Sequence, residues 1–195
     1  MPLDLLSVEK PARYMGGEMG SVAKAAADLR IALAFPDVYE VGMSHLGLRI
    51  LYQILTTLDG IAAERVYTPW PDMAAQMAAE QVTLTTLETA TPLAKTDIVG
   101  FTLQYELSCT NILTMLRQAA IPLRAADRDE SWPLVLGGGP GAFNPEPLAP
   151  FFDAFLLGDG EEAVIEIANL VRDWKTSASR NKQDLLKKLS ALDGV

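Results

Sequence analysis

Residues 97–103 have the sequence DIVGFTL, an apolar run of the length and composition typical of a buried strand. Its residues do not alternate between apolar and polar, so we expect both faces of this strand to be covered. A helix with regularly spaced apolar residues is expected directly after it, over residues 106–119. The segment therefore predicts an α/β fold with a parallel sheet, in which helices connect successive strands.

The same alternation of short strands and helices extends over most of the chain. Further strands are expected at residues 30–36, 64–68, 82–87, 133–136 and 153–157. Further helices are expected at residues 46–58, 71–80 and 161–174, and a short one ends near Leu192. Ser44 is the expected N-cap of the helix at 46–58, and Gly60 is its expected stop. Residues 22–29 have the composition of one more short helix.

The composition favours one globular domain and excludes several classes of partner. The chain has 195 residues, of which 49% are hydrophobic and 21% are charged. Its net charge of −9 argues against direct binding of nucleic acid. Its apolar stretches are far shorter than the roughly 20 residues of a membrane span, and residues 1–4, MPLD, do not resemble a secretory signal. We expect a cytoplasmic protein that does not bind membranes.

The scarcity of cysteine and histidine limits the chemistry of this chain. A single Cys109 excludes an internal disulfide, a multi-thiolate zinc site and an iron–sulfur cluster held by this chain alone. The single His45 excludes a zinc site made of three histidines, and no G-x-S-x-G elbow is present. We expect no protein metal site and no catalytic residue here, so any chemistry would come from a bound cofactor.

Ligands of parallel sheets bind outside the carboxyl ends of the strands, so the loops at those ends are the candidate site. These loops are residues 37–44, 104–106, 137–146 and 158–161. Glycines 137–139 let the backbone turn and approach a ligand, although a tight turn serving only the fold would look the same. The four prolines between 140 and 150 exclude a long helix after these glycines, which disfavours a Rossmann dinucleotide site.

Two other features of these loops have both a ligand-binding and a structural interpretation. Asp159 and Glu161 lie at the expected start of a helix, where carboxylates complement the helix dipole. They would repel a phosphate, so we expect them to meet hydroxyl or amide groups of a ligand. His45 lies near the start of another helix, either as a capping residue or as a ligand of a metal carried by a cofactor, oriented by Asp37 or Glu40.

Taken together, three segments resemble one known domain. They are FPDVYEVGMSHLGLRILY at 35–52, DIVGFTLQYELSCTN at 97–111 and LVLGGGPGAFNPEPLAPFFDAFLLGDGEEA at 134–163. The chain resembles the N-terminal cobalamin-binding-like domain of radical S-adenosylmethionine (SAM) proteins. KPARYMGGEMGSV at 10–22 and VYTPWPDM at 66–73 are similar to an uncharacterised branch of that family.

The resemblance implies a flavodoxin-like, doubly wound sheet of about five parallel strands. It implies an N-terminal arm at 1–29, the cobalamin-binding-like domain at 30–175, and a helix and the start of a linker at 176–195. Cobalamin would lie across the strand ends, with its nucleotide tail running toward the turn at 137–139. The residues expected to contact it are Asp37, Tyr39, Met43, Ser44, His45, Thr102, Leu103, Gln104, Gly137, Gly138, Gly139, Pro140, Asn144, Gly158, Asp159, Gly160 and Glu161.

The resemblance also implies that this chain is one module of a larger enzyme. S-adenosylmethionine and an iron–sulfur cluster would be bound by a radical SAM core in the same polypeptide, since C-x-x-x-C-x-x-C is absent here. We expect this domain to position the corrinoid and not to catalyse by itself. Two alternatives remain: a cofactor-free domain that docks the core or recruits a partner, and a binder of flavin or sugar nucleotides. The first would apply if Phe143, Tyr105 or Tyr39 fills the crevice.

His45 departs from the pattern of cobalamin domains that replace the lower ligand of cobalt by histidine. Those domains carry D-x-H-x-x-G, whereas here Asp37 lies eight residues before His45 and Gly47 lies two after it. The S-x-L of the third strand is matched only loosely, by Thr102-Leu103-Gln104. We therefore expect His45 to line or rim the crevice without ligating cobalt.

Overall fold

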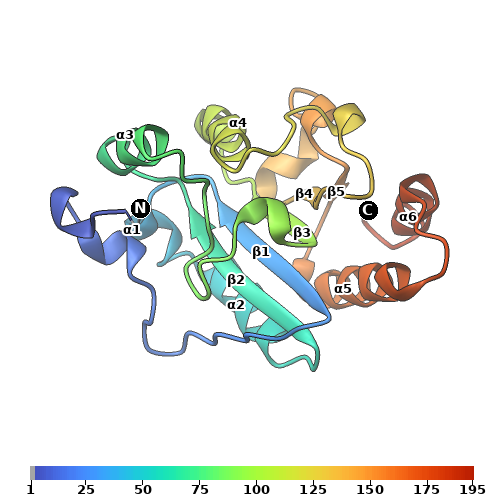
Figure 1. Ribbon diagram of the computed structural model, residues 1–195. Coiled ribbons are helices and arrows are strands. Elements are labelled where there is room, and N and C mark those ends of the chain that lie inside the picture. Colours follow the sequence, from blue (N-terminus) through green and yellow to red (C-terminus); the bar gives the residue numbers. More distant parts are fainter. Residues whose placement is uncertain (1–2) are drawn as a thin grey trace.

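The computed structural model describes residues 3–195, and its centre is a five-stranded, wholly parallel sheet (Figure 1). The strands are β1 (Leu29–Phe35), β2 (Ile61–Tyr67), β3 (Ile98–Thr102), β4 (Leu134–Gly138) and β5 (Ala154–Leu156). They are arranged in the order β2-β1-β3-β4-β5. This is the flavodoxin-like doubly wound order, and it confirms the predicted fold class.

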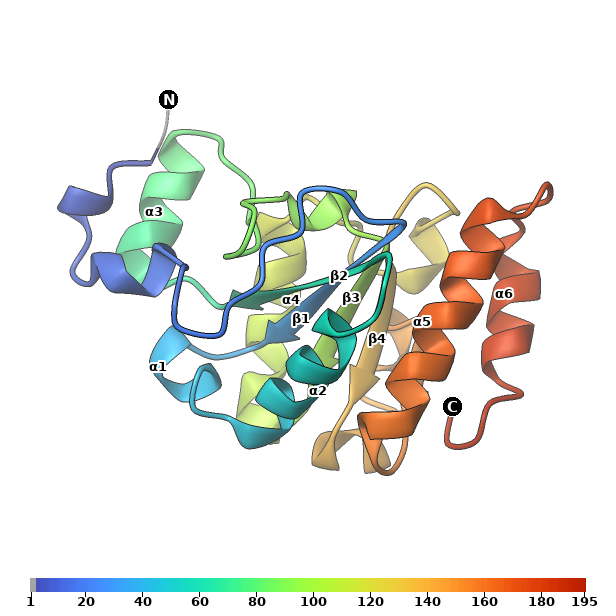
Figure 2. The ribbon, with the colours of Figure 1, turned by 90° about the horizontal axis from the view of Figure 1, so that it is seen from below.

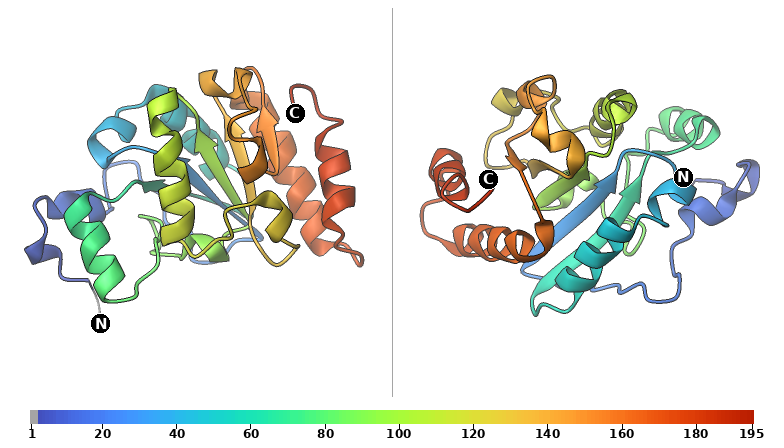
Figure 3. Two further views of the ribbon diagram at one scale, coloured as in Figure 1. Left: turned by 90° about the horizontal axis from the view of Figure 1, so that it is seen from above. Right: turned by 180° about the vertical axis from the view of Figure 1, so that it is seen from behind.

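Helices cover both faces of the sheet. One face carries α2 (Leu46–Thr56), α5 (Gly160–Thr176) and α6 (Lys182–Leu189), and the other carries α3 (Pro71–Ala79) and α4 (Cys109–Gln118) (Figures 2 and 3). The short helix α1 (Tyr39–Gly42) follows β1. Single 3₁₀ turns occur at Leu5–Ser7, Pro11–Tyr14, Leu93–Lys95, Glu106–Ser108, Ala125–Asp127, Pro140–Phe143 and Ala149–Phe151. None of the helices within residues 3–195 is long and apolar enough to cross a membrane.

Strand β1 shows why both faces are covered. Leu29, Ile31 and Leu33 point into the apolar cluster beneath α2 and α5. Ala32 and Ala34 point into the cluster beneath α3 and α4. All five are buried, as the absence of polar alternation predicts for a central strand of a parallel sheet.

The strand predicted at 82–87 is wrong. This segment runs beside the free edge of β2, but its only bridge pairs Thr85 with Pro92. Leu87 donates its backbone N–H to the carbonyl of Arg65 at 2.9 Å, while the Glu88 side chain accepts the Arg65 backbone N–H at 2.6 Å. A carboxylate therefore occupies the place of the next backbone partner, which ends the pairing and protects the edge.

The short helix suggested for 22–29 is also wrong. The carbonyls of Lys24 and Ala25 accept hydrogen bonds from the Arg30 guanidinium, both at 3.2 Å. The Lys24 ammonium donates to the carbonyls of Leu58 and Ile61, both at 2.9 Å. The segment is therefore held by long-range contacts and not by local helical hydrogen bonds.

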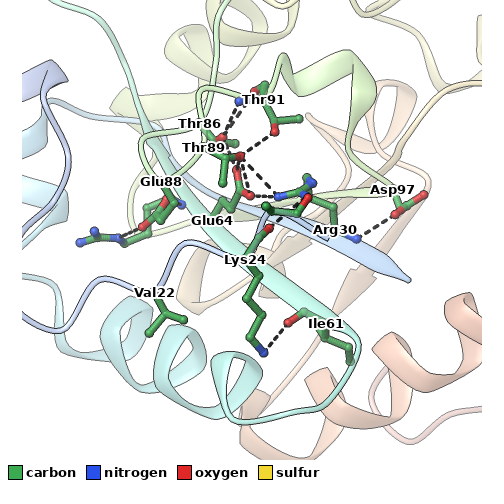
Figure 4. A network of polar contacts seen from close by, with 12 residues as sticks. Val22, Lys24, Arg30, Ile61, Glu64, Thr86, Glu88, Thr89, Thr91 and Asp97 are labelled. Carbon is green, nitrogen blue, oxygen red and sulfur yellow. Dashed lines mark hydrogen bonds and ion pairs between the residues drawn. The ribbon is translucent and has the colours of Figure 1, made fainter. Parts of the chain in front are cut away.

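A buried ion pair joins β1 and β2 to the loop that follows α3 (Figure 4). Glu64 of β2 is fully buried and pairs with Arg30 of β1. Thr86 donates a hydrogen bond to the same carboxylate, and the Thr89 hydroxyl lies 2.8 Å from both of its oxygens. The loop predicted as a strand thus supplies hydroxyl groups that solvate a buried charge.

Removing this charge should destabilise the fold. We expect Glu64→Gln to lower the free energy of unfolding by about 3 kcal/mol, because Arg30 would lose its anionic partner. Urea denaturation followed by circular dichroism measures the change. Glu166→Gln on the exposed side of α5 is the matched control and should change stability by less than about 0.5 kcal/mol. A loss for Glu64→Gln no larger than that of the control would contradict this role of Glu64.

Candidate cofactor-binding cleft

A cleft of about 610 Å³ lies at the carboxyl ends of β1, β3 and β4, between α2 and α5. This is where strand order reverses, since β1 leads to β2 on one side and β3 leads to β4 on the other. Its volume is within the range of about 300–1,000 Å³ typical of small-molecule sites. It is lined by Ile31, Leu33, His45, Gly47, Leu48, Leu51, Ile98, Gly100, Phe101, Thr102, Gln104, Leu136, Gly137, Gly138, Gly139, Pro140, Phe143, Leu156, Gly158, Asp159, Gly160, Glu161, Val164 and Ile167.

The floor of the cleft is the α2/α5 face of the sheet, and glycines leave part of it bare. A Cβ built on Gly100 of β3 would have no neighbour closer than the carbonyl oxygen of Ala32, at 4.0 Å. A Cβ on Gly138 of β4 would first meet Leu156 at 3.8 Å. A Cβ would therefore fit at either position and would project into the space that the cleft now occupies.

Two helices form the walls. Leu48 and Leu51 of α2 face Val164 and Ile167 of α5 across the cleft. Gly160 at the start of α5 allows the helices to approach, because a Cβ there would lie 3.3 Å from the Cδ2 atom of Leu51. The walls and the floor are largely apolar, which favours a flat or aromatic group of a ligand between them.

His45 lies on the cleft wall and caps α2, so the prediction of Ser44 as the N-cap is wrong. The Nδ1 atom of His45 accepts the backbone N–H of Leu48 at 3.1 Å. The ring also packs against Phe35, and it has room because a Cβ on Gly47 would be 3.1 Å from the imidazole. The Ser44 hydroxyl instead donates to the Val41 carbonyl at 3.0 Å.

This hydrogen bond determines which imidazole nitrogen carries the proton. Because Nδ1 accepts, the neutral ring has its proton on Nε2 and presents a donor there. Neither carboxylate expected to orient His45 contacts it. Asp37 accepts hydrogen bonds from Tyr105 and from the Val38 backbone, and Glu40 pairs with Lys10 and Arg13 on the N-terminal arm.

The mouth of the cleft is formed by the loops after β3, β4 and β5. Gly137 and Gly138 belong to β4, so the turn predicted at 137–139 is made at Gly139 alone, with φ of +103°. A Cβ on Gly139 would lie 3.0 Å from the carbonyl oxygen of Leu103. Both the backbone conformation and the lack of space therefore favour glycine at this position. Phe143 stands at the mouth with 71% of its surface exposed and leaves the cleft open.

Two carboxylates and an amide supply the polar groups of the mouth. Asp159 is the N-cap residue of α5, and its side chain makes no capping hydrogen bond. Glu161 follows in the first turn, and both line the cleft with Gln104. Acceptors on Asp159 and Glu161 suit amide or hydroxyl donors of a ligand better than a phosphate.

Two contacts hold together the loops that diverge at the switch point. The hydroxyl of Tyr105, after β3, donates to the carboxylate of Asp37, after β1, and this hydrogen bond raises the pKa of Tyr105. Asn111 of α4 donates its amide N–H to the carbonyl of Pro36 at 3.0 Å. These contacts connect the loop after β1 to the loop after β3 and to α4.

The structure separates the predicted site residues into two groups. His45, Thr102, Gln104, Gly137, Gly138, Gly139, Pro140, Gly158, Asp159, Gly160 and Glu161 line the cleft together. Asp37, Tyr39, Met43, Ser44, Leu103 and Asn144 do not line it. Leu103 is buried in the core on the opposite face of the sheet, and Tyr39 points toward the N-terminal arm, where its hydroxyl donates to Glu18 at 2.7 Å.

Sequence reasoning missed the apolar part of the cleft. Gly100 belongs to a segment predicted only as a buried strand, and Leu48, Leu51, Val164 and Ile167 belong to segments predicted only as helices. The spacing of Gly160, Val164 and Ile167, four and three residues apart, could have indicated one helix face turned toward the strand ends.

Exposed apolar side chains gather on the loops that carry the mouth. They include Met43 and Leu46 after β1, Leu107 after β3, Phe143 after β4 and Leu157 after β5, with 39% to 86% of their surface exposed. We call these five residues the apolar rim. Exposed apolar groups that cluster beside a cleft are typical of an interaction surface.

The comparison with known proteins identifies the family. A family model for the N-terminal region of radical SAM proteins matches residues 47–195. The chain belongs to this family. No curated protein matches the chain. The matched residues include both helix walls and the β3 and β4 part of the floor, whereas Ile31, Leu33 and His45 of the cleft precede the match. Within residues 3–195, no group of three or more His, Cys, Asp or Glu side chains is arranged to hold a metal ion.

Proposed function

We propose that this radical SAM N-terminal domain binds a corrinoid in the cleft and presents it to a radical SAM core of the same polypeptide. The observation that supports it is the bare, glycine-lined floor between two apolar helix faces at the switch point. When bound, a corrinoid would supply cobalt-centred chemistry such as methyl transfer.

The residues that line the cleft fit a corrinoid. A corrinoid offers a flat ring, an aromatic base on a tail and a periphery of amides. The space above Gly100, between Leu51 and Val164, suits a planar apolar group such as the base. The cleft is too small for the whole molecule, so the ring would remain at the mouth, where Asp159 and Glu161 can accept from amide N–H groups.

Each part of the cleft has a separate task in this proposal. The walls of α2 and α5 exclude water from the buried part of the ligand. Gly139 makes the turn after β4 that positions the loop at the mouth. His45 orients a peripheral acceptor through its Nε2–H, while its Nδ1 remains the cap of α2.

The apolar rim provides the surface on which the core would dock. Its residues lie on segments that follow the strands at the cleft end of the sheet, and Phe143 lines the cleft itself, so docking there would cover the exposed part of the ligand. The backbone N–H of Leu157, a rim residue, donates to the carbonyl of Gly194 at 2.7 Å. Gly194 therefore lies beside Leu157.

The cofactor-free alternative depends on aromatic side chains filling the cleft. The Tyr39 hydroxyl donates to Glu18 of the N-terminal arm, the Tyr105 hydroxyl donates to Asp37, and Phe143 only borders the mouth. These positions favour a ligand-binding cleft over a pure docking domain.

A binding measurement tests the proposal directly. We expect the 195-residue chain, mixed with hydroxocobalamin at micromolar concentration, to keep corrinoid absorbance in its gel-filtration peak. Flavin mononucleotide, used in the same way, should not comigrate. A protein peak without corrinoid absorbance, or one that retains only the flavin, would contradict the proposal.

A series at Gly100 tests where the ligand lies. We expect Gly100→Ala to weaken corrinoid binding moderately and Gly100→Leu to abolish it, because the longer side chain occupies the slot above β3. Gly100→Ala should not lower the thermal unfolding temperature, since its Cβ meets no close neighbour and glycine weakens a strand interior. Equal affinity of Gly100→Leu and the unchanged chain would place the ligand elsewhere.

His45 should not ligate the metal of the bound ligand. Asn is a good N-cap residue, so His45→Asn should preserve α2, and we expect it to leave the cobalt-sensitive absorption bands nearly unchanged. His45→Ala should lower the free energy of unfolding by about 1 kcal/mol with the same unchanged spectrum. A clear shift of the cobalt-sensitive bands in both variants would show that the imidazole ligates the metal.

A further inference from the structure

A second cavity of about 220 Å³ lies at the free edge of β2, beneath the N-terminal arm. Its walls come from the arm, the end of β2, α3 and residues 83–90, and we call it the arm cavity. It shares no lining residue with the cleft between α2 and α5. Two segments that the cleft does not use, residues 10–22 and 66–73, meet around it.

Two residues of the arm cavity carry buried polar atoms that have no hydrogen-bond partner. They are the Nη1 atom of Arg13 and the hydroxyl of Tyr67, from side chains of residues only 7% and 6% exposed. Leaving a buried donor unsatisfied costs about 1–3 kcal/mol. Such a cost at two residues of one cavity points to a ligand that satisfies them.

The free nitrogen of Arg13 and the hydroxyl of Tyr67 are donors that a negatively charged acceptor would satisfy best. The Nε atom of Arg13 donates to both oxygens of Glu40 at 3.0 Å, but Lys10 pairs with the same carboxylate, so two cations face one anion. Burial raises the pKa of Tyr67, so its hydroxyl keeps its proton and donates. A carboxylate accepts from both without offering a competing donor.

The remaining walls define the rest of the ligand. Met73, Met77 and Leu84 are buried and line the cavity. A cavity of about 150 Å³ lined by apolar groups stays dry and holds benzene, so the arm cavity has space for a ring and one polar group. Water would fill the apolar part poorly, because each buried water needs two to four polar partners.

We propose that the arm cavity binds a small monocarboxylate with an apolar body about the size of a benzene ring. Its carboxylate accepts hydrogen bonds from Arg13 and Tyr67, and its body lies against the two methionines of α3. The site is independent of the corrinoid proposal, since a failure to bind corrinoid would leave the arm cavity and its donors unchanged.

Benzoate is the probe of this proposal. Benzamide and benzylamine carry the same phenyl ring with a neutral and a cationic group, and they serve as the controls. We expect saturable binding of benzoate to the 195-residue chain at millimolar concentration, measured by ligand-observed NMR, and a rise in unfolding temperature. Benzamide should bind at least about tenfold more weakly, and benzylamine should not bind. Equal binding of all three compounds, or no binding of benzoate, would overturn the proposal.

Two pairs of variants separate a binding role from a structural one. Tyr67→Phe should weaken benzoate binding about tenfold without lowering stability in the absence of ligand, because the lost hydroxyl has no protein partner. Tyr52→Phe is the control: its hydroxyl accepts the Val22 backbone N–H at 2.7 Å, so this variant should lose stability and keep benzoate affinity.

The second pair concerns Arg13. Arg13→Lys keeps a cation for Glu40 but removes the free nitrogen, so benzoate affinity should fall about tenfold. Lys10→Met removes the other cation of Glu40 without touching the cavity donors, and it should reduce affinity by less. Unchanged affinity in both Tyr67→Phe and Arg13→Lys would show that benzoate binds outside the arm cavity.

Discussion

The reversal of strand order between β1 and β3 is the constraint on which the rest of this structure depends. Right-handed connections require α2, which leads from β1 to β2, and α4, which leads from β3 to β4, to lie on opposite faces of the sheet. The loops after β1 and β3 therefore diverge. The space they leave is closed by α5, and the cleft follows from topology before any single side chain is considered.

Side chains then determine how open that space remains. The hydrogen bond from Tyr105 to Asp37 and the one from Asn111 to the Pro36 carbonyl hold the diverging loops at a fixed separation. Gly100 and Gly138 leave the floor bare. On the far edge, the Glu64 network and the Glu88 side chain end the sheet at β2 and shape the segment that borders the arm cavity.

The sequence predicted the order of most elements and the strand-end loops of the cleft, because apolar periodicity and glycine positions are local signals. It failed where long-range polar contacts override local preference. Residues 82–87 have the composition of a strand, but Glu88 replaces the backbone partner of Arg65. Ser44 is the better N-cap by residue type, yet the imidazole of His45 reaches the Leu48 N–H because Gly47 leaves room for it.

The glycines of the floor bear on function because they do not serve the fold. At Gly139 the positive φ and the nearby Leu103 carbonyl require glycine for structural reasons alone. At Gly100 neither reason applies: the residue lies inside a strand, and a Cβ would meet nothing closer than 4.0 Å. A strand interior is weakened by glycine and strengthened by a packed side chain. A sequence selected only for a stable sheet would fill that space with the side chain of residue 100, so a bare floor there favours a site that receives a ligand.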